Sequence, residues 1–197
     1  MAEHSTPFTY DAVIVAGGTG ERLGGVSKPD LVVHESRLLD RVLEAVATAR
    51  ARVVVGDVAV PDGVAVTCED PPRSGPAAGV VAGLTALATS APFIALLACD
   101  LANPGPAVDH LLASIDPDQQ VDGWCLTDGN DHLQWLLGVY RRDAVRVAAD
   151  RLGDPTNRSM GALLGSLHLR AIPGSDHLVA DIDTPADLTR HRQGEPA

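Results

Sequence analysis

The chain has 197 residues, enough for one domain with a sizeable core, and its 26 acidic against 15 basic residues give a formal net charge of −11. So acidic a chain is not expected to bind nucleic acid or an anionic membrane, because both need a basic surface. Its apolar runs fall short of the roughly 20 residues of a membrane helix, and its first residues lack the pattern of a signal peptide. We therefore predict a cytoplasmic, single-domain protein over residues 1–197, with a core of about 10–191.

Strands and helices are predicted in alternation along the chain. The first strand is predicted over Asp11–Ala16, and a glycine-rich loop follows it. The segment Ser36–Ala49 has apolar residues at helical spacing, with Ser36 as its predicted N-cap. Later strands are predicted over residues 52–56, 64–70, 93–99, 121–127, 135–140 and 167–172. Later helices are predicted over 75–90, 106–115, 143–152 and 159–167, and a short one is predicted to begin near Pro185.

This alternation predicts an α/β protein in which a mostly parallel sheet lies between two helical layers, a three-layer αβα fold. In such sheets the ligand binds beyond the carboxyl ends of the strands. The glycine-rich loop, Asp70 and Asp100 are expected there. The three cysteines, Cys68, Cys99 and Cys125, each lie in an apolar run, and we predict reduced core thiols.

The glycine-rich loop AGGTGERLGGVSKPD spans residues 16–30 and is of a type that binds phosphate, because backbone N–H groups without a neighbouring Cβ can approach phosphate oxygens. It does not match a dinucleotide fingerprint, since Leu23 stands where the third glycine belongs. It does not match a P-loop either, since Pro29 follows the lysine. A glycine-rich surface turn without function is the alternative interpretation.

Lys28 is the only lysine in the chain, against fourteen arginines. An ammonium group is a compact charge on a flexible stem, whereas a guanidinium group is planar and needs more space. The use of lysine here, in a chain that otherwise uses arginine, indicates that Lys28 contacts a phosphate oxygen.

With these residues in view, the chain resembles the molybdenum cofactor guanylyltransferases, within the wider group of nucleotidyltransferases with a Rossmann-like αβα fold. The resemblance rests on four motifs that occur in the family's order between residues 13 and 188. They are Ala16-Gly17-Gly18 with Arg22, Gly24-Gly25 and Lys28; Asp70 with Gly75-Pro76-Ala77-Ala78-Gly79; Cys99-Asp100; and Asp183-Thr184-Pro185-Ala186-Asp187-Leu188. The chain departs from the family at Asp57, where an asparagine is common, and at Ser27, where an acidic residue is usual.

The resemblance implies an Mg²⁺-dependent enzyme that transfers GMP from GTP to molybdopterin and releases pyrophosphate. It also implies transient contact with molybdoenzymes or with proteins that handle the cofactor. Catalytic roles are expected for Lys28, Arg22 and Asp100, and metal binding for Asp100 and Asp183, with Asp181 as a supporting residue. Nucleotide contacts are expected from Val15, Ala16, Gly17, Gly18, Lys28, Asp70, Gly75, Gly79 and Asp100.

Several of these residues also have a purely structural interpretation. Asp183 is also expected as an N-cap of the last helix, and Asp70 as a cap of the Pro71-Pro72 turn. Arg158 and Trp135 are candidates for acceptor binding, with a solvated side chain and core packing as the respective alternatives. Alternative functions are cytidylyl or other nucleotidyl transfer to a different phosphorylated acceptor, such as a sugar phosphate or phospholactate, and a non-catalytic nucleotide-binding regulator.

Overall fold

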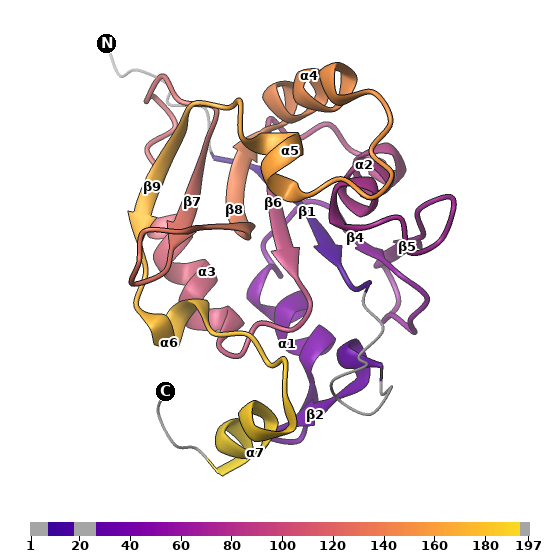
Figure 1. Ribbon diagram of the computed structural model, residues 1–197, viewed down its shortest axis with the longest axis vertical. Coiled ribbons are helices and arrows are strands. Elements are labelled where there is room, and N and C mark those ends of the chain that lie inside the picture. Colours follow the sequence, from indigo (N-terminus) through magenta and orange to yellow (C-terminus); the bar gives the residue numbers. More distant parts are fainter. Residues whose placement is uncertain (1–7, 18–26, 194–197) are drawn as a thin grey trace.

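A seven-stranded sheet lies at the centre of the protein, in the strand order β5-β4-β1-β6-β8-β7-β9 (Figure 1). The computed structural model describes residues 8–17 and 27–193, so the predictions for Gly18 and Arg22 lie outside the described residues. The strands of this sheet are β1 (Tyr10–Val15), β4 (Arg52–Val55), β5 (Ala65–Thr67), β6 (Phe93–Ala98), β7 (Gly123–Thr127), β8 (Leu133–Arg141) and β9 (Leu169–Pro173). A separate two-stranded hairpin is formed by β2 (Val32–Val33) and β3 (Ser36–Arg37).

All neighbouring strands of the large sheet are parallel except at β8, which is antiparallel to both β6 and β7. The prediction of a mostly parallel sheet is therefore confirmed. Because β8 runs in the opposite direction, its first residues lie at the edge where β1 and β6 end. That edge is the one at which open α/β sheets bind their ligands.

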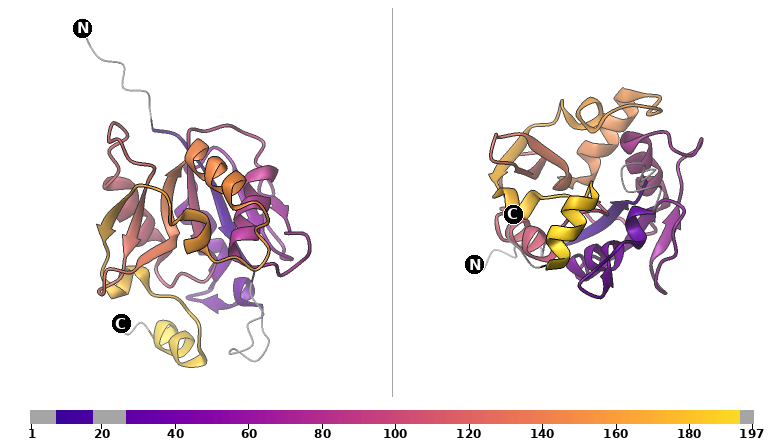
Figure 2. Two further views of the ribbon diagram at one scale, coloured as in Figure 1. Left: turned by 45° about the horizontal axis from the view of Figure 1, so that its top comes forward. Right: turned by 60° about the horizontal axis from the view of Figure 1, so that its bottom comes forward.

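Helices cover both faces of the sheet (Figure 2). They are η2 (Lys28–Asp30), α1 (Leu38–Ala45), α2 (Pro76–Ala86), α3 (Pro104–Ala113), α4 (Arg142–Leu152), α5 (Met160–Leu164), α6 (Asp176–Val179) and α7 (Pro185–Gln193). Buried residues of α1 and α3 form one core with the sheet, and those of α2, α4 and α5 form a second core on the opposite face. The three-layer αβα prediction is thereby confirmed. Among the described residues, every helix is too short or too polar to cross a membrane.

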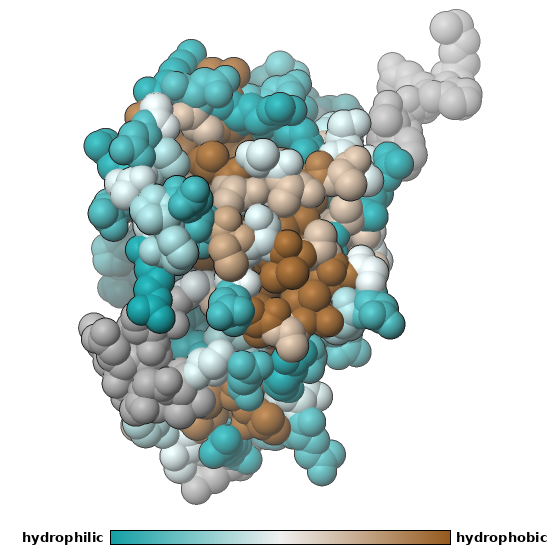
Figure 3. All heavy atoms as spheres, turned by 90° about the vertical axis from the view of Figure 1, so that its right-hand side faces the viewer, coloured by the Kyte–Doolittle hydropathy of each residue, from teal (hydrophilic) through white to brown (hydrophobic). Residues whose placement is uncertain are grey.

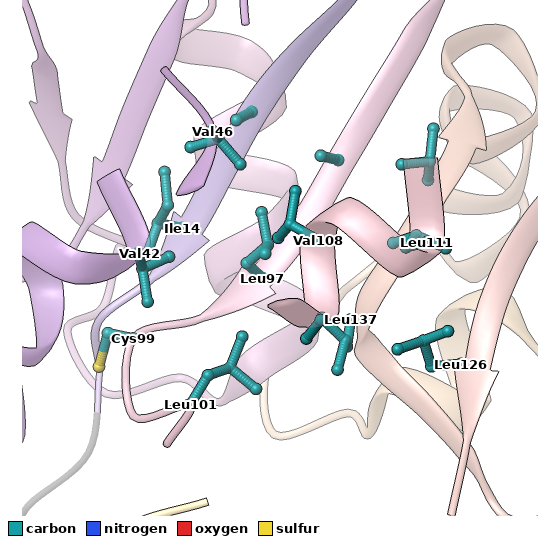
Figure 4. Packing of buried hydrophobic residues seen from close by; sticks show 14 of the residues in the cluster. Ile14, Val42, Val46, Leu97, Cys99, Leu101, Val108, Leu111, Leu126 and Leu137 are labelled. Carbon is teal, nitrogen blue, oxygen red and sulfur yellow. The ribbon is translucent and has the colours of Figure 1, made fainter. Parts of the chain in front are cut away.

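The core extends directly beneath the end of β6 (Figure 4). Cys99 and Leu101, on either side of Asp100, are 2% and 3% exposed and pack in the same cluster as Ile14, Val42 and Leu97. A third, smaller core joins Leu31, Val33, Leu38, Ala102 and Ile182. This smaller core ties the η2–β3 segment and the C-terminal segment to the loop that carries Asp100.

The helix predicted over Ser36–Ala49 is shorter than expected, and Ser36 is not its N-cap. His34 and Glu35 have φ values of 49° and 67°, and such a pair of left-handed residues forms a tight turn between antiparallel strands. Ser36 then pairs with Val33 in the hairpin, so that α1 begins only at Leu38. The hairpin formed by this turn therefore includes Ser36 and Arg37, which the helical spacing had assigned to the helix.

Cys68 is exposed, whereas Cys99 and Cys125 are buried, so the prediction of three core thiols is wrong for Cys68. Cys68 follows β5, which forms the edge of the sheet and has one strand neighbour. The apolar run of this strand remains partly on the surface, with Val66 51% exposed. Figure 3 views the molecule from this side, where hydrophobic residues gather on the surface.

Candidate active site

Lys28 lies between two carboxylates that come from distant parts of the chain. Its Nζ atom is 2.8 Å from Oδ2 of Asp100, and it also forms an ion pair with Asp183. The side chains of Lys28 and Asp100 are 17% and 18% exposed, whereas that of Asp183 is 47% exposed. The structure therefore brings together three of the residues expected at the site.

Asp100 is held in place by the chain that precedes Asp183. The backbone N–H of Ile182 donates to the carbonyl of Asp100 at 2.9 Å, and that of Ala102 donates to the carbonyl of Ala180 at 2.8 Å. Leu101 and Asp181 form the antiparallel bridge between these two bonds. The backbone hydrogen bonds thus hold the segment that carries Asp100 against the segment that leads directly into Asp183.

Asp183 does not cap helix α7, because Thr184 does so. Oγ1 of Thr184 accepts from the backbone N–H of Asp187, and the carboxylate of Asp187 accepts from the backbone N–H of Thr184, which forms a capping box. Oγ1 of Thr184 also donates to Oδ2 of Asp187 at 2.7 Å, and this bond, followed by the one from the backbone N–H of Thr184, lowers the pKa of Asp187. The capping alternative is therefore wrong for Asp183, whose carboxylate pairs with Lys28 instead.

The charges of the site act on one another. Partial burial acts to lower the pKa of Lys28, but hydrogen bonds and charge from Asp100 and Asp183 outweigh it and raise the pKa, so the amine stays protonated. Asp181 reaches solvent, yet loss of water around its carboxyl group, together with the charges of Asp100 and Asp183, raises its pKa to about 7. The cluster thus carries more negative than positive charge at neutral pH.

The two carboxylates fit a divalent cation. Both already converge on one cationic group, the Lys28 ammonium. Mg²⁺ is commonly bound through one or two carboxylates plus substrate phosphates and water. In the described part of the chain, no group of three or more His, Cys, Asp or Glu side chains is placed to hold a metal ion. Further ligands for a metal at Asp100 and Asp183 would thus come from a phosphate-bearing substrate or from water.

A cavity of about 410 Å³ opens beside the carboxyl end of β1. It is lined by Val15, Gly17, Glu69, Arg73, Gly75, Pro76, Gly79 and Leu136. Four of these, Val15, Gly17, Gly75 and Gly79, were expected to contact the nucleotide. Ala16 lies between two of them with its side chain buried, and it belongs to the core.

The amino end of helix α2 forms one wall of this cavity. Gly75 precedes the helix with a φ of 90°, a conformation that favours glycine, and Pro76 occupies the first turn. The N-terminus of a helix carries free N–H groups and partial positive charge, which favour a bound anion. The motif Gly75-Pro76 therefore places a phosphate-compatible helix end at the cavity.

Glu69, rather than its neighbour Asp70, lines the cavity. Asp70 is exposed, whereas Glu69 is partly buried and its Oε1 accepts from the backbone N–H of Arg73 at 2.9 Å. Arg73 has a φ of 65° and also lines the cavity. Sequence reasoning missed Glu69 and Arg73. Glu69 lies at the end of the predicted third strand, and Arg73 lies between that strand and the Gly75 motif. Their position next to this motif is the signal that could have found them.

A second cavity, of about 210 Å³, shares Pro76 and Leu136 with the first. Its other lining residues are Leu101, Leu133, Gln134, Trp135, Leu137, Met160, Val179 and Asp181. Trp135 is partly buried and packs against the core of the α2 face, so it has both a structural contact and a surface in the cavity. Arg158 is exposed. Its backbone lies close to Gly75, which lines the first cavity, because a Cβ placed on Gly75 would be 3.7 Å from the carbonyl oxygen of Arg158.

Solved structures from several organisms share this fold. Molybdopterin-guanine dinucleotide biosynthesis protein A of Archaeoglobus fulgidus has a TM-score of 0.65 at 20% identity, over 93% of this chain and 97% of that one. A nucleotidyl transferase of Methanothermobacter thermautotrophicus has a TM-score of 0.70 at 19% identity, over 94% and 97%. The 2-C-methyl-D-erythritol 4-phosphate cytidylyltransferase of Thermus thermophilus has a TM-score of 0.64 at 17% identity, over 94% and 98%.

In sequence, the molybdenum cofactor guanylyltransferase of Acidiphilium cryptum is 38% identical over 85 residues. That match covers 40% of this chain and 43% of the relative, so it spans less than half of the relative's length. The family model described as "MobA-like NTP transferase domain" matches residues 12–170. This match covers most of the chain and, with the shared fold, decides the family: the chain belongs to the MobA-like NTP transferases, a family of nucleotidyltransferases.

Proposed function

We propose that this protein is an Mg²⁺-dependent guanylyltransferase that transfers GMP from GTP to molybdopterin and releases pyrophosphate. The observation that carries the proposal is the pair of adjoining cavities, the second of which reaches the cluster of Lys28, Asp100 and Asp183 through its lining residues Leu101 and Asp181. The first cavity has the glycine-lined walls of a nucleotide site, and the second has the apolar and aromatic walls that suit a ring system. Transfer between two substrates requires two such sites side by side.

The reaction proposed is a displacement at phosphorus. An oxygen of the terminal phosphate of molybdopterin attacks the α-phosphorus of GTP, and a new P–O bond forms. The bond from the α-phosphorus to the bridging oxygen breaks, and pyrophosphate leaves with the electron pair. Because the attacking phosphate is already an anion at neutral pH, no strong general base is required. The protein's task is to hold anions together and to offset the charge that develops.

Lys28 is the residue that we propose for this task in the described part of the chain. Its ammonium is protonated and sits on a flexible stem, so it can reach an oxygen of the departing pyrophosphate. Arg22, outside the described residues, is proposed for the same charge. Asp100 and Asp183 would hold Mg²⁺, which when bound supplies positive charge at the phosphates.

Guanine selectivity is proposed to arise in the first cavity. Guanine offers two N–H donors, at N1 and N2, beside the O6 acceptor, and a carboxylate is a suitable acceptor for both donors. Glu69 brings a carboxylate to this cavity. The backbone at Val15–Gly17 and Gly75–Gly79 can approach the base closely, because its side chains are small or absent at most positions. The relative from Acidiphilium cryptum, named for guanylyl transfer, supports the same nucleotide.

The second candidate is cytidylyl transfer to another phosphorylated acceptor, which the fold shared with a cytidylyltransferase favours. A test is to measure kcat/KM for GTP, CTP, ATP and UTP with Mg²⁺ and a pyrophosphate readout, each with molybdopterin, a sugar phosphate, methylerythritol phosphate or phospholactate. We expect GTP with molybdopterin to be used best. Equal or better use of CTP would exclude guanylyl transfer, and nucleotide binding without turnover of any pair would favour a regulator.

A further inference from the structure

The ammonium of Lys28 occupies the point on which the carboxylates of Asp100 and Asp183 converge. The same two carboxylates are those proposed to hold the metal ion. Two cations within a few ångströms repel each other strongly, most of all at a partly buried site, where water screens them less. Lys28 and Asp100 are both largely shielded from solvent, at 17% and 18% side-chain exposure. The lysine and a divalent ion therefore compete for one position.

We propose that Lys28 and the metal ion are alternative occupants of the Asp100–Asp183 carboxylate pair, so that Lys28 closes the metal site in the nucleotide-free enzyme. This inference rests on the proposed function only for the presence of a divalent metal at this pair. The backbone bonds between residues 100–102 and 180–182 hold together the two segments that carry Asp100 and Asp183, and an aspartate side chain is short, whereas the lysine stem is long and flexible. The movable partner is therefore Lys28, and a triphosphate offers its ammonium an alternative anionic contact.

The arrangement gives the lysine two successive roles. Without nucleotide, Lys28 neutralises the carboxylates and keeps the charge of the cluster low. With nucleotide, its ammonium contacts phosphate oxygens and leaves the carboxylates free for a cation. The nucleotide and the metal are thus expected to bind with positive coupling, because each favours the position of Lys28 that the other requires. A planar guanidinium at this position would not move between the two sites in the same way.

The single lysine of the chain makes the proposal directly observable. Protein grown with lysine labelled with ¹⁵N at Nζ gives one ammonium signal, without any need for assignment. We expect addition of Mg²⁺ alone to move the chemical shift of this signal toward that of free lysine. The Mg²⁺ concentration at the midpoint of this change should agree with the affinity for Mg²⁺ measured by calorimetry. If Mg²⁺ binds in a manner that Asp183→Asn abolishes and the Lys28 signal stays where it was, the proposal is wrong.

Direct metal binding provides the second test, without nucleotide or acceptor. Lys28→Met keeps the length of the stem and removes the charge, and we expect it to bind Mn²⁺ at least about tenfold more tightly than the wild type, as removal of one nearby like charge predicts. Lys28→Met/Asp183→Asn should lose this gain. Arg73→Met, which removes a positive charge from the wall of the first cavity, is the matched control and should change the affinity less than about twofold.

Equal or weaker Mn²⁺ binding by Lys28→Met would overturn the proposal, as would a gain of the same size in Arg73→Met. Absence of detectable Mn²⁺ binding in the wild type and in every variant would overturn it too. None of these measurements contains a nucleotide or an acceptor. A failure of guanylyl transfer, seen as a preference for CTP or another acceptor, therefore leaves this result untouched, and the two outcomes are distinguishable.

Discussion

Nζ of Lys28 lies 2.8 Å from Oδ2 of Asp100, although the two residues are 72 positions apart in the chain. This ion pair connects the end of the glycine-rich loop to the end of strand β6, and the pairing of Lys28 with Asp183 adds the C-terminal segment. The site is therefore assembled from three separate parts of the sequence. A substitution at Lys28 tests the function of this site more directly than one at the glycines, because replacement of a glycine can also change the backbone conformation.

Lys28→Ala should lower kcat by roughly 10²–10³, the usual loss when one stabiliser of transition-state charge is removed. Lys28→Arg should also be slower than the wild type, although it keeps the charge, because a planar group does not replace a compact one. The free energy of unfolding should change by about 1 kcal/mol or less, because the carboxylates of Asp100 and Asp183 keep contact with water, at 18% and 47% side-chain exposure, when the ammonium is removed. Pyrophosphate release and thermal unfolding measure the two effects. A folded Lys28→Ala variant with wild-type turnover would show that Lys28 has no part in the reaction.

Much of the fold could be predicted from the sequence, because buried parallel strands are continuous apolar runs and the helices between them have a clear period. Phe93–Ala98 and Pro76–Ala86 lie where they were expected. Ser36 could not be assigned correctly, because a turn at His34 and Glu35 competes with the helix. The two signals overlap in sequence, and the pairing of Ser36 with Val33 decides between them.

The candidate site was only partly predictable. Motif order placed Lys28, Asp100 and Asp183 at one site, and the structure brings them together. That the lysine bridges both carboxylates depends on contacts across 72 and 155 positions, which no local pattern contains. Whether Glu69 or Asp70 lines the first cavity depends on how the chain runs before Pro71. Glu69 is partly buried there, whereas its neighbour Asp70 is exposed. The sequence also could not decide whether Asp183 or its neighbour Thr184 caps helix α7, and in the structure Thr184 caps it.

Two glycines one turn apart in α2 should respond differently to alanine. A Cβ on Gly83 would lie 2.4 Å from Cγ1 of the fully buried Val13, whereas a Cβ on Gly79 would lie 3.5 Å from Cγ1 of Val15, an ordinary contact. For Gly83→Ala, overpacking of about 1–3 kcal/mol should exceed a gain of about 1 kcal/mol in helix propensity. Chemical denaturation should show lower stability for Gly83→Ala and unchanged or higher stability for Gly79→Ala. Equal effects would contradict the packing argument.

The three thiols should differ in reactivity. Burial raises the pKa of Cys99, and it raises the pKa of Cys125 to about 11, so both are protonated and inaccessible in the folded protein. Cys68 is exposed. Titration of the native protein with a disulfide reagent should give one fast thiol, and denaturant should release the other two. The control is Cys68→Ser, which should show no fast thiol. Two fast thiols in the native wild type would mean that one of the buried cysteines is accessible.

Stability should fall below neutral pH partly because of His191. This residue is 7% exposed, and burial, followed by the nearby charges of Arg190 and Arg41, lowers its pKa below 6.5. Between the lowered pKa and 6.5 the unfolded chain binds more protons than the folded one, so stability rises with pH through that window and is lost as pH falls through it. His191→Gln, which has no titrating group, should therefore reduce the difference in melting temperature between pH 5.5 and 7.5. A pH dependence equal to that of the wild type would exclude a contribution from His191.

The ion pair between Asp11 and Arg142 should dominate the polar contribution to stability on the α2 face of the sheet. The two side chains are 0% and 8% exposed, Oγ1 of Thr89 donates to Asp11 at 2.6 Å, and Nε of Arg142 donates to the carbonyl of Ala91 at 2.8 Å. Removal of one partner leaves a buried charge without its counter-charge, so Asp11→Ala and Arg142→Met should each cost about 3–5 kcal/mol. Replacement of both should cost much less than the sum, because no isolated charge remains. Denaturant unfolding of the wild type, both single variants and the double variant measures this coupling. Additive losses would show that the two residues stabilise the fold independently, through Thr89 and Ala91 rather than through each other.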